Sequence, residues 1–132
     1  MYDAFGGSSI THTPRIMGNA PMLTQVFRNL LENACRYSPE YGTIVICAHV
    51  TNNEMVFAIK DQGPGIAQSE LPQIFERLYQ VNKERNSGSS GIGLAICKHI
   101  IRLHKGIIWA ESPYESYATA MLFTLPLEEP VT

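Results

Sequence analysis

The sequence predicts a single α+β domain, and three patterns support this class. Apolar residues recur at helical spacing over 23–34, form short strand-like segments over 43–60, and return to helical spacing over 94–103. A chain of 132 residues falls within the usual size of one domain, about 100–200 residues. It can bury a core without disulfide or metal staples. We therefore expect helices and strands that share one hydrophobic core.

The first helix is expected to run from about residue 19 to residue 38. Asn19 is a suitable N-cap and Pro21 is tolerated in a first turn. Pro39 ends the helix, because the residue before a proline avoids helical torsion angles. The stripe expected to face the core consists of Leu23, Val26, Phe27, Leu30, Leu31 and Ala34.

A second, polar set of side chains lies beside that stripe. It recurs at i, i+3, i+4, i+7 and i+8 and consists of Asn29, Glu32, Asn33, Arg36 and Tyr37. Two carboxamides, a carboxylate, a cation and an aromatic ring thus line up along about two turns of helix. The set suits a magnesium-bound polyphosphate with a flat base beside it. It equally fits the solvated face of an amphipathic helix.

The remaining elements follow from short apolar segments and the turns between them. Strands over 43–50 and 55–60 are expected to form a hairpin. The other expected elements are an edge strand at 15–17, a short helical region at 68–79, a polar loop at 80–90, a helix at 94–103, and strands at 107–111 and 119–125. Residues 1–13 are expected to be a loose leader, 14–127 the domain and 128–132 a polar tail.

The first glycine-rich turn, Asp61-Gln-Gly-Pro-Gly-Ile66, directly follows a predicted strand. A carboxylate at a strand end is partly buried and must find hydrogen-bond donors. The exocyclic amine of adenine is one such donor, and a wall of glycines lets a flat ring approach the backbone. The alternative is a plain turn, which this composition also favours.

The second glycine-rich turn, Gly91-Ile-Gly93-Leu94, opens the second predicted helix. Such a loop is a ready anion site, because unpaired N–H groups and the helix dipole both favour phosphate. It is not a P-loop, since no Gly-Lys-Ser/Thr follows. It is not a dinucleotide fingerprint, since the third glycine is missing and no strand precedes it.

Composition excludes several classes of protein. Ten Lys and Arg against twelve Asp and Glu give a net charge of −2, so no overall basic field points to nucleic acid. No apolar run is long enough to span a membrane, and the start lacks the features of a signal peptide. The three cysteines form no CxxC pair and are expected to be buried thiols in a reducing compartment. We expect a cytosolic domain.

In this order, the features resemble the ATP-binding catalytic domain of sensor histidine kinases, within the superfamily of gyrase, Hsp90 and mismatch-repair ATPases. The resemblance covers about residues 15–127. It rests on the 29–37 set, Asp61-x-Gly63-x-Gly65, Phe75-Glu-Arg77 and Gly91-x-Gly93. It implies a two-layer α/β sandwich of the Bergerat type. A mixed five-stranded sheet would back three helices, with ATP between the helices and a lid loop.

The resemblance also implies roles for individual residues. Asn33 would ligate Mg²⁺ with Asn29 beside it, since hard oxygen ligands suit this ion. Asp61 would accept from the adenine amine, with Thr119 nearby. Arg77 is either a solvated charge or a phosphate contact. The implied nucleotide-binding set is Asn33, Arg36, Tyr37, Asp61, Gly63, Gly65, Ile66, Arg77, Lys83, Ser90, Gly91, Ile92, Gly93, Leu94 and Thr119.

Position 29 separates a kinase from a hydrolase. The gyrase and Hsp90 branches carry a glutamate there that activates water, whereas this chain has Asn29, and a carboxamide is no useful base near pH 7. The site should therefore spare the γ-phosphoryl group for another nucleophile. Glu32 would either orient a Mg²⁺-bound water or be a helix-surface charge. A serine kinase or an ATP-driven clamp is disfavoured by Asn29 and the Phe75 segment.

The chain also departs from the family pattern. Ser89 replaces a glycine, Gln80 replaces an arginine whose place Arg77 or Lys83 would take, and Lys105 replaces the first glycine of a pair.

No histidine has the helical context of a phosphate acceptor. The expected partners are therefore a separate dimerisation domain carrying that histidine and a downstream response regulator. The domain itself is expected to be monomeric and unable to autophosphorylate alone. The full-length protein could be anchored in the cell membrane. The alternative function is a degenerate nucleotide-sensing or interaction module without phosphotransfer.

Overall fold

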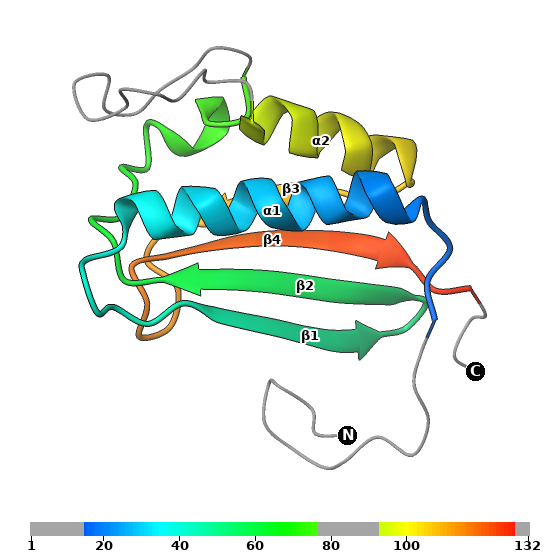
Figure 1. The fold of residues 1–132 in the computed structure, drawn as a ribbon, viewed down its shortest axis with the longest axis horizontal. Helices are drawn as coiled ribbons and strands as arrows, with labels where there is room; N and C mark the ends of the chain where they lie inside the picture. Colours follow the sequence, from blue (N-terminus) through cyan, green and yellow to red (C-terminus); the bar gives the residue numbers. More distant parts are fainter. Residues whose placement is uncertain (1–14, 77–92, 129–132) are drawn as a thin grey trace.

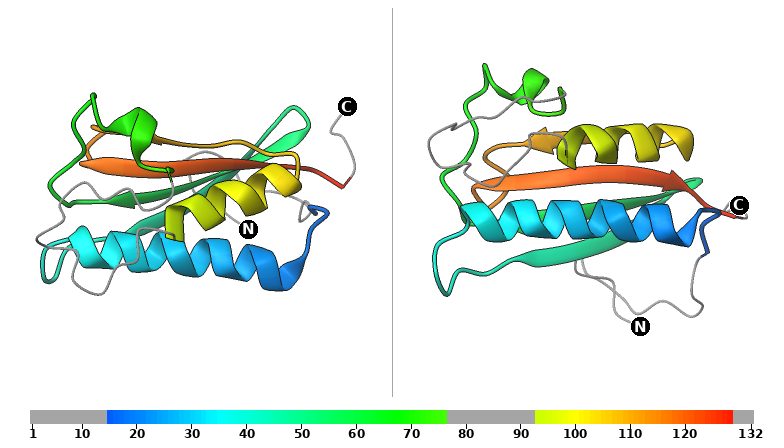
Figure 2. Two further views of the ribbon diagram at one scale, coloured as in Figure 1. Left: turned by 90° about the horizontal axis from the view of Figure 1, so that it is seen from above. Right: turned by 45° about the horizontal axis from the view of Figure 1, so that its top comes forward.

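The computed structural model describes residues 15–76 and 93–128. Within these residues, one face of a four-stranded sheet is covered by two helices, α1 (Ala20–Tyr37) and α2 (Gly93–Leu103). Figure 1 shows α1 running across the sheet with α2 beside it, and Figure 2 shows from two further sides that both helices lie on the same face. The predicted α+β class is confirmed, and so is the packing of a helical layer on a sheet.

The sheet differs from the expected mixed, five-stranded one. Its strands are β1 (Val45–Thr51), β2 (Glu54–Asp61), β3 (Ile108–Glu111) and β4 (Thr119–Pro126), in the order β1-β2-β4-β3. All three neighbouring pairs are antiparallel, because two hairpins join through β2 and β4. The expected edge strand at 15–17 is reduced to one bridge between Ile16 and Leu127.

The helical layer is also smaller than expected in the part that the structure describes. The short helical region expected at 68–79 is described as far as residue 76, and it contains a 3₁₀ helix at Leu71–Gln73. Pro72 lies inside this segment and lacks an N–H group, so it cannot donate a helical hydrogen bond. The expected lid loop over 80–90 lies outside the described residues.

The α1 helix begins and ends where the sequence predicts. The Asn19 side chain accepts a hydrogen bond from Met22 N–H over 3.0 Å, so it caps the first turn. Ser38 has an extended backbone and its N–H bonds to the Ala34 carbonyl. The far end of α2 supports the same cap, since Nε2 of His104 accepts from the Asn19 N–H at 3.0 Å.

The core lies between the helices and the sheet. Leu23, Val26, Leu30 and Ala34 of the predicted stripe are buried, while Phe27 and Leu31 are half-buried and pack against them. The ring of Phe27 meets those of Phe57 and Phe123 edge-on, each at 5.4 Å between centroids. These aromatic contacts fix the distance between α1 and the strands β2 and β4.

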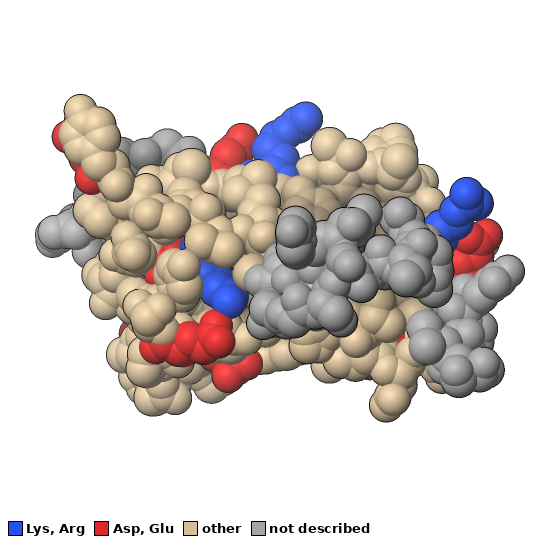
Figure 3. All heavy atoms as spheres, turned by 90° about the horizontal axis from the view of Figure 1, so that it is seen from below, with Lys and Arg blue, Asp and Glu red and all other residues tan. Residues whose placement is uncertain are grey.

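Surface features complete the description. No helix in the described ranges is long and apolar enough to cross a membrane. Figure 3 shows basic and acidic side chains interspersed among uncharged ones on the described part of the face seen from below.

Cys47 and Cys97 are buried as predicted, but Cys35 is exposed, because its position on α1 lies outside the core stripe.

Candidate functional site

The structure divides the polar set of α1 into two groups. Asn29, Asn33 and Tyr37 succeed one another at i, i+4 and i+8 and are half-buried, whereas Glu32 and Arg36 are exposed. An offset of one residue turns a side chain by about 100° around the helix. The sequence predicted a single face; the structure shows a half-buried row beside an exposed one.

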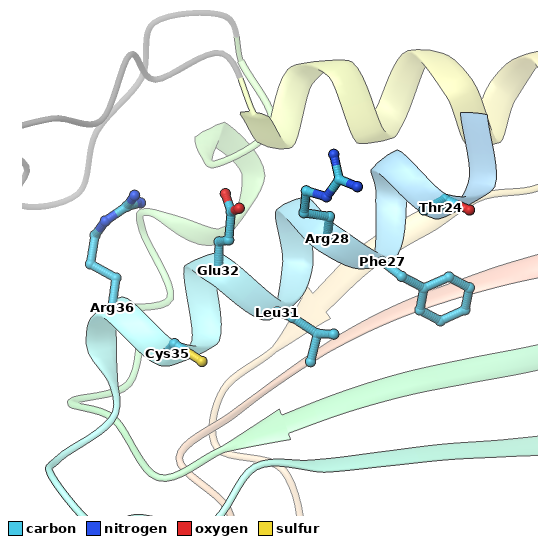
Figure 4. Close-up of a pocket in the computed structure, with 7 residues that line it drawn as sticks. All are labelled: Thr24, Phe27, Arg28, Leu31, Glu32, Cys35 and Arg36. Carbon is cyan, nitrogen blue, oxygen red and sulfur yellow. The ribbon is translucent and has the colours of Figure 1, made fainter. Parts of the chain in front are cut away.

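Glu32 and Arg36 line a shallow groove of about 800 Å³ on the flank of α1. In Figure 4, Phe27, Leu31 and Cys35 point toward the strands, while Arg28, Glu32 and Arg36 point to the other side of the helix. Thr24 completes the lining, which includes neither asparagine of the half-buried row. The groove thus lies beside that row on the neighbouring face of α1.

Asn29 joins α1 to the beginning of α2. Its side-chain N–H donates to the Gly93 carbonyl at 3.3 Å, and a Cβ at Gly93 would lie 3.9 Å from Asn29 Cγ. Burial raises the pKa of the Cys97 thiol to about 12, and the Asn29 side chain opposes that rise. The amide nitrogen of Asn29 is thus directed toward α2.

Asp61 is the buried carboxylate that the sequence predicted at the end of β2. Only 5% of its surface is exposed, and its Oδ1 accepts a hydrogen bond from Gly63 N–H at 2.9 Å. Burial raises the pKa of Asp61, while the bond from Gly63 opposes that rise. In the pairing of β2 with β4, Asp61 lies directly opposite Thr119, so their side chains share one face of the sheet.

Residues 61–66 form a close-fitting segment, here named the Asp61 wall. A Cβ at Gly63 would lie 2.7 Å from the Tyr37 carbonyl oxygen, so only glycine fits where the wall meets the end of α1. Gly65 has φ +80°, which favours glycine. The backbone N–H of Ile66 donates to Ser112 Oγ at 2.8 Å. The wall is therefore held from both sides.

Ser112 is a member of this site that sequence reasoning missed. It is 6% exposed, and its hydroxyl contacts Ile66, Ala118 and Thr119. A serine between a strand and Pro113 carries no local pattern that distinguishes it from an ordinary loop residue. The only available signal was its position just after β3, at the same end of the sheet as Asp61.

Other predicted site residues are placed less completely. Leu94 is half-buried and packs against the main core. Arg77, Lys83, Ser90, Gly91 and Ile92 lie outside the described residues. Across ranges 15–76 and 93–128, no group of three or more His, Cys, Asp or Glu could hold a metal ion.

Chemically, the arrangement offers acceptors at one end and carboxamides along α1. The buried Asp61 carboxylate suits a hydrogen-bond donor on a ligand that excludes water. The half-buried Asn29 and Asn33 present neutral oxygen and nitrogen atoms, which can meet a metal or an anion without adding charge. A ligand with a flat, amine-bearing end and a metal-bound anionic end would match this distribution.

Comparison with known proteins gives a consistent set of relatives. Residues 18–129 match the family model described as histidine kinase-, DNA gyrase B-, and HSP90-like ATPase. The sensor histidine kinase WalK of Bacillus subtilis is 40% identical over 111 residues, which are 81% of this chain and 18% of that protein. The histidine-protein kinase BaeS of Escherichia coli is 37% identical over 91% of this chain and 26% of its own length. The chain thus spans about a quarter or less of these two relatives.

Solved structures agree with the sequence comparison. A mycobacterial sensor histidine kinase, MprB, superposes with a TM-score of 0.78 at 30% identity, over 88% of this chain and 78% of that one. The catalytic domain of the histidine kinase ThkA gives a TM-score of 0.73 at 27% identity, over 84% of this chain and 70% of that one.

Proposed function

We propose a phosphotransfer function for this chain, which belongs to the family of histidine kinase-, DNA gyrase B- and HSP90-like ATPases and is an ATPase domain of the histidine kinase type. It binds Mg·ATP and donates the γ-phosphoryl group to a histidine. That histidine lies on a separate dimerisation domain, and a response regulator is the downstream acceptor. The chain itself supplies the nucleotide site.

The observation that carries the proposal is the buried Asp61 at the end of β2. A carboxylate that is 5% exposed and whose pKa is raised by burial is costly to keep charged without a donor. The exocyclic amine of adenine would provide that donor. The adjoining Gly63 and Gly65 let a flat ring lie close to the backbone of the wall.

Magnesium fits the residues that are present. Asn33 and Asn29 offer hard oxygen atoms on one half-buried row of α1, and Mg²⁺ characteristically takes only one or two protein ligands together with substrate phosphates and water. We assign Asn33 as the direct ligand and Asn29 as its neighbour. When bound, the ion would neutralise phosphate charge during transfer. Arg36 and the segment 90–94 are assigned to the phosphates, and Tyr37 to the base.

The proposal of a kinase instead of a hydrolase rests on Asn29. Its amide nitrogen donates to the Gly93 carbonyl, so the side chain is a hydrogen-bonded tether between two helices. A carboxamide cannot take a proton from water as a glutamate would. Glu32 is exposed; of its two predicted roles, a surface charge accords with that exposure better than the orientation of a metal-bound water.

The first test of the proposal is magnesium-dependent nucleotide binding. Titration with a fluorescent ATP analogue should saturate, and Mg²⁺ should strengthen binding. Asn33→Ala should abolish most of this Mg²⁺-dependent gain, lowering affinity about tenfold, as expected for the loss of one good polar contact. Gln25→Ala, on an exposed position of the same helix, is the matched control and should bind like the parent. An absence of saturable binding by the parent chain would refute the proposal.

A second test separates phosphotransfer from nucleotide sensing alone. The chain is mixed with a histidine-bearing dimerisation hairpin from a related sensor kinase and with labelled ATP. Acid-labile label on the hairpin histidine is the expected result, and none should appear when Asn33→Ala replaces the parent. Binding of ATP without any transfer would favour a nucleotide-sensing module instead.

A further inference from the structure

Ser112 lies where three backbone segments of the site meet. Its Oγ accepts a hydrogen bond from Ile66 N–H at 2.8 Å and donates one to the Ala118 carbonyl at 2.6 Å. The same oxygen lies 3.2 Å from Thr119 Oγ1. One buried hydroxyl therefore joins the Asp61 wall to the loop that leads into β4.

The direction of the bond between Ser112 and Thr119 follows from hydrogen counting. A serine hydroxyl has one hydrogen and two lone pairs. The Ala118 carbonyl can only accept, so it takes the hydrogen of Ser112. The amide of Ile66 can only donate, so it occupies one lone pair. The second lone pair remains for Thr119, whose hydroxyl must therefore be the donor.

This direction decides what Thr119 can offer to a ligand. Its hydrogen is used by Ser112, so toward any other partner its oxygen can only accept. Thr119 lies opposite Asp61 in the pairing of β2 with β4, and an ionised carboxylate is likewise an acceptor only. Two acceptors thus stand side by side on one face of the sheet, and neither has a hydrogen to give.

We infer that Ser112 is a specificity-determining residue for the purine. By holding the hydroxyl hydrogen of Thr119, it keeps the pocket acceptor-only, so that a 6-amino purine is bound and a 6-oxo purine is rejected. The inference rests on the proposed nucleotide-binding function and adds to it the residue that sets the preferred purine edge. Ser112 acts through Thr119 and is a positioning residue, without contact to the substrate.

The test compares ATP with inosine triphosphate, which carries an oxygen in place of the 6-amino group. Dissociation constants for both are measured by displacement of a fluorescent nucleotide in the presence of Mg²⁺. The parent chain should strongly prefer ATP. In Ser112→Ala the hydroxyl of Thr119 can turn and donate to the 6-oxo group, so the ratio of the two constants should fall about tenfold. Ser116→Ala, an exposed serine of the same loop, should keep the parent ratio.

A double-mutant cycle separates this role from simple loop support. If Ser112 acts through Thr119, then Ser112→Ala should leave the ratio unchanged in a Thr119→Val background, where no hydroxyl remains to turn. A purely structural Ser112 would weaken both nucleotides equally and leave the ratio unchanged in the parent background. That result, or an equal fall in ratio in both backgrounds, would overturn the inference.

A measurement on the parent chain covers the case in which Ser112→Ala does not fold. The hydroxyl proton of Thr119 should exchange slowly with water and show a nuclear Overhauser contact to the β-protons of Ser112. A rapidly exchanging proton would contradict the assigned direction. Failure of the parent chain to bind either nucleotide would refute the proposed function and this inference with it. An unchanged ratio in a chain that binds ATP refutes the inference alone.

Discussion

Lys60 and Asp61 are consecutive charged residues of β2, and they differ in how far other residues of the fold compensate their charges. Because side chains alternate along a strand, they point to opposite faces of the sheet. Both are buried, at 7% and 5% exposure. Asp61 faces the helices and the candidate site, whereas Lys60 lies on the other face. The surroundings of the two charges are unlike.

Lys60 is surrounded by groups that favour its charge. Its Nζ lies 2.7 Å from Glu115 Oε1, and it is 5.3 Å and 5.6 Å from the ring centroids of Tyr114 and Tyr117. Burial by itself would lower the pKa of Lys60, but the hydrogen bond with Glu115 and the charges of Cys47, Glu115 and Tyr114 together outweigh burial and raise it. This charge is compensated within the fold.

Asp61 has much less compensation within the described part of the chain. A single backbone donor, Gly63 N–H, meets its carboxylate, and burial raises its pKa. Perturbed carboxylates of this kind are characteristic of functional sites. Burial alone therefore does not mark a candidate site; burial with few partners in the described residues does, because hydrogen-bonding capacity is then left for a ligand.

The largest expected effect is on nucleotide affinity in Asp61→Asn. The amide oxygen can still accept from Gly63, but the charged acceptor for the adenine amine is lost. Hydrogen bonds to charged groups contribute about 1.5–3 kcal/mol, so ATP affinity should fall about 10- to 100-fold by isothermal titration calorimetry. Glu115→Gln, which removes a charge from the opposite face, is the control and should bind ATP like the parent. Equal losses in the two variants would remove the distinction between the faces.

Gly63→Ala should reduce stability at the junction of the Asp61 wall with α1. The added Cβ would lie 2.7 Å from the backbone oxygen of Tyr37, so the wall or the helix end must shift. Overpacking of this kind costs about 1–3 kcal/mol, measurable by urea unfolding, and ATP binding should weaken with it. Pro64→Ala, exposed in the same turn, should cost about 1 kcal/mol or less. Unaltered stability in Gly63→Ala would show that the junction is loose.

The pH dependence of stability offers a smaller effect with a definite sign. The pKa of Asp61 is raised in the folded chain, so the folded state binds a proton more tightly than the unfolded one. Stability should therefore decline as the pH rises from the unfolded pKa through the folded pKa, and level off above it. Asp61→Asn lacks this decline. Its melting temperature without nucleotide should exceed that of the parent above the window and approach it below.

The smallest expected effect is on the compensated face. Glu115 is 59% exposed at its side chain, so solvent screens its pairing with Lys60. Glu115→Gln should cost about 0.5–1 kcal/mol in urea unfolding at neutral pH, as is usual for such pairs. The deficit should vanish at alkaline pH once Lys60 loses its proton, because a raised lysine pKa stabilises the fold only below that value. A loss as large as that of Gly63→Ala would mean that this pair is a principal support of the sheet.

Much of the fold could be predicted from local patterns. The N-cap at Asn19, the end of α1 before Pro39, and both hairpin strands were predicted to within about two residues. Helical spacing and strand propensity act between near neighbours in the chain, so the sequence carries them directly. The sheet was predicted less well, since the antiparallel pairing of β2 with β4 joins residues 58 to 72 positions apart in the chain.

The candidate site shows the same division. Asp61 and the glycines after it were identifiable because a charged residue at a strand end, followed by a glycine turn, is a local signal. The sequence did not show that Glu32 and Arg36 lie on a different helix face from Asn29 and Asn33, because neighbouring faces differ only in what packs against them. Ser112 was missed for a similar reason: Ala118 belongs to its own loop, but its other partner, Ile66, comes from a segment 46 residues away.

The sequence by itself determined where the two long helices and the strands of the first hairpin lie, and which residue types could meet a metal, a phosphate and a base. Only the tertiary structure decided which of those residues share a surface, and in which direction their hydrogens point. Gly106 illustrates the difference. It follows the end of α2, where a glycine usually takes the positive φ, but here Lys105 takes it, with φ 65°. Gly106 is needed because a Cβ there would lie 1.9 Å from the Thr124 carbonyl oxygen. Torsional preference is local, whereas close approach depends on what the rest of the chain brings alongside.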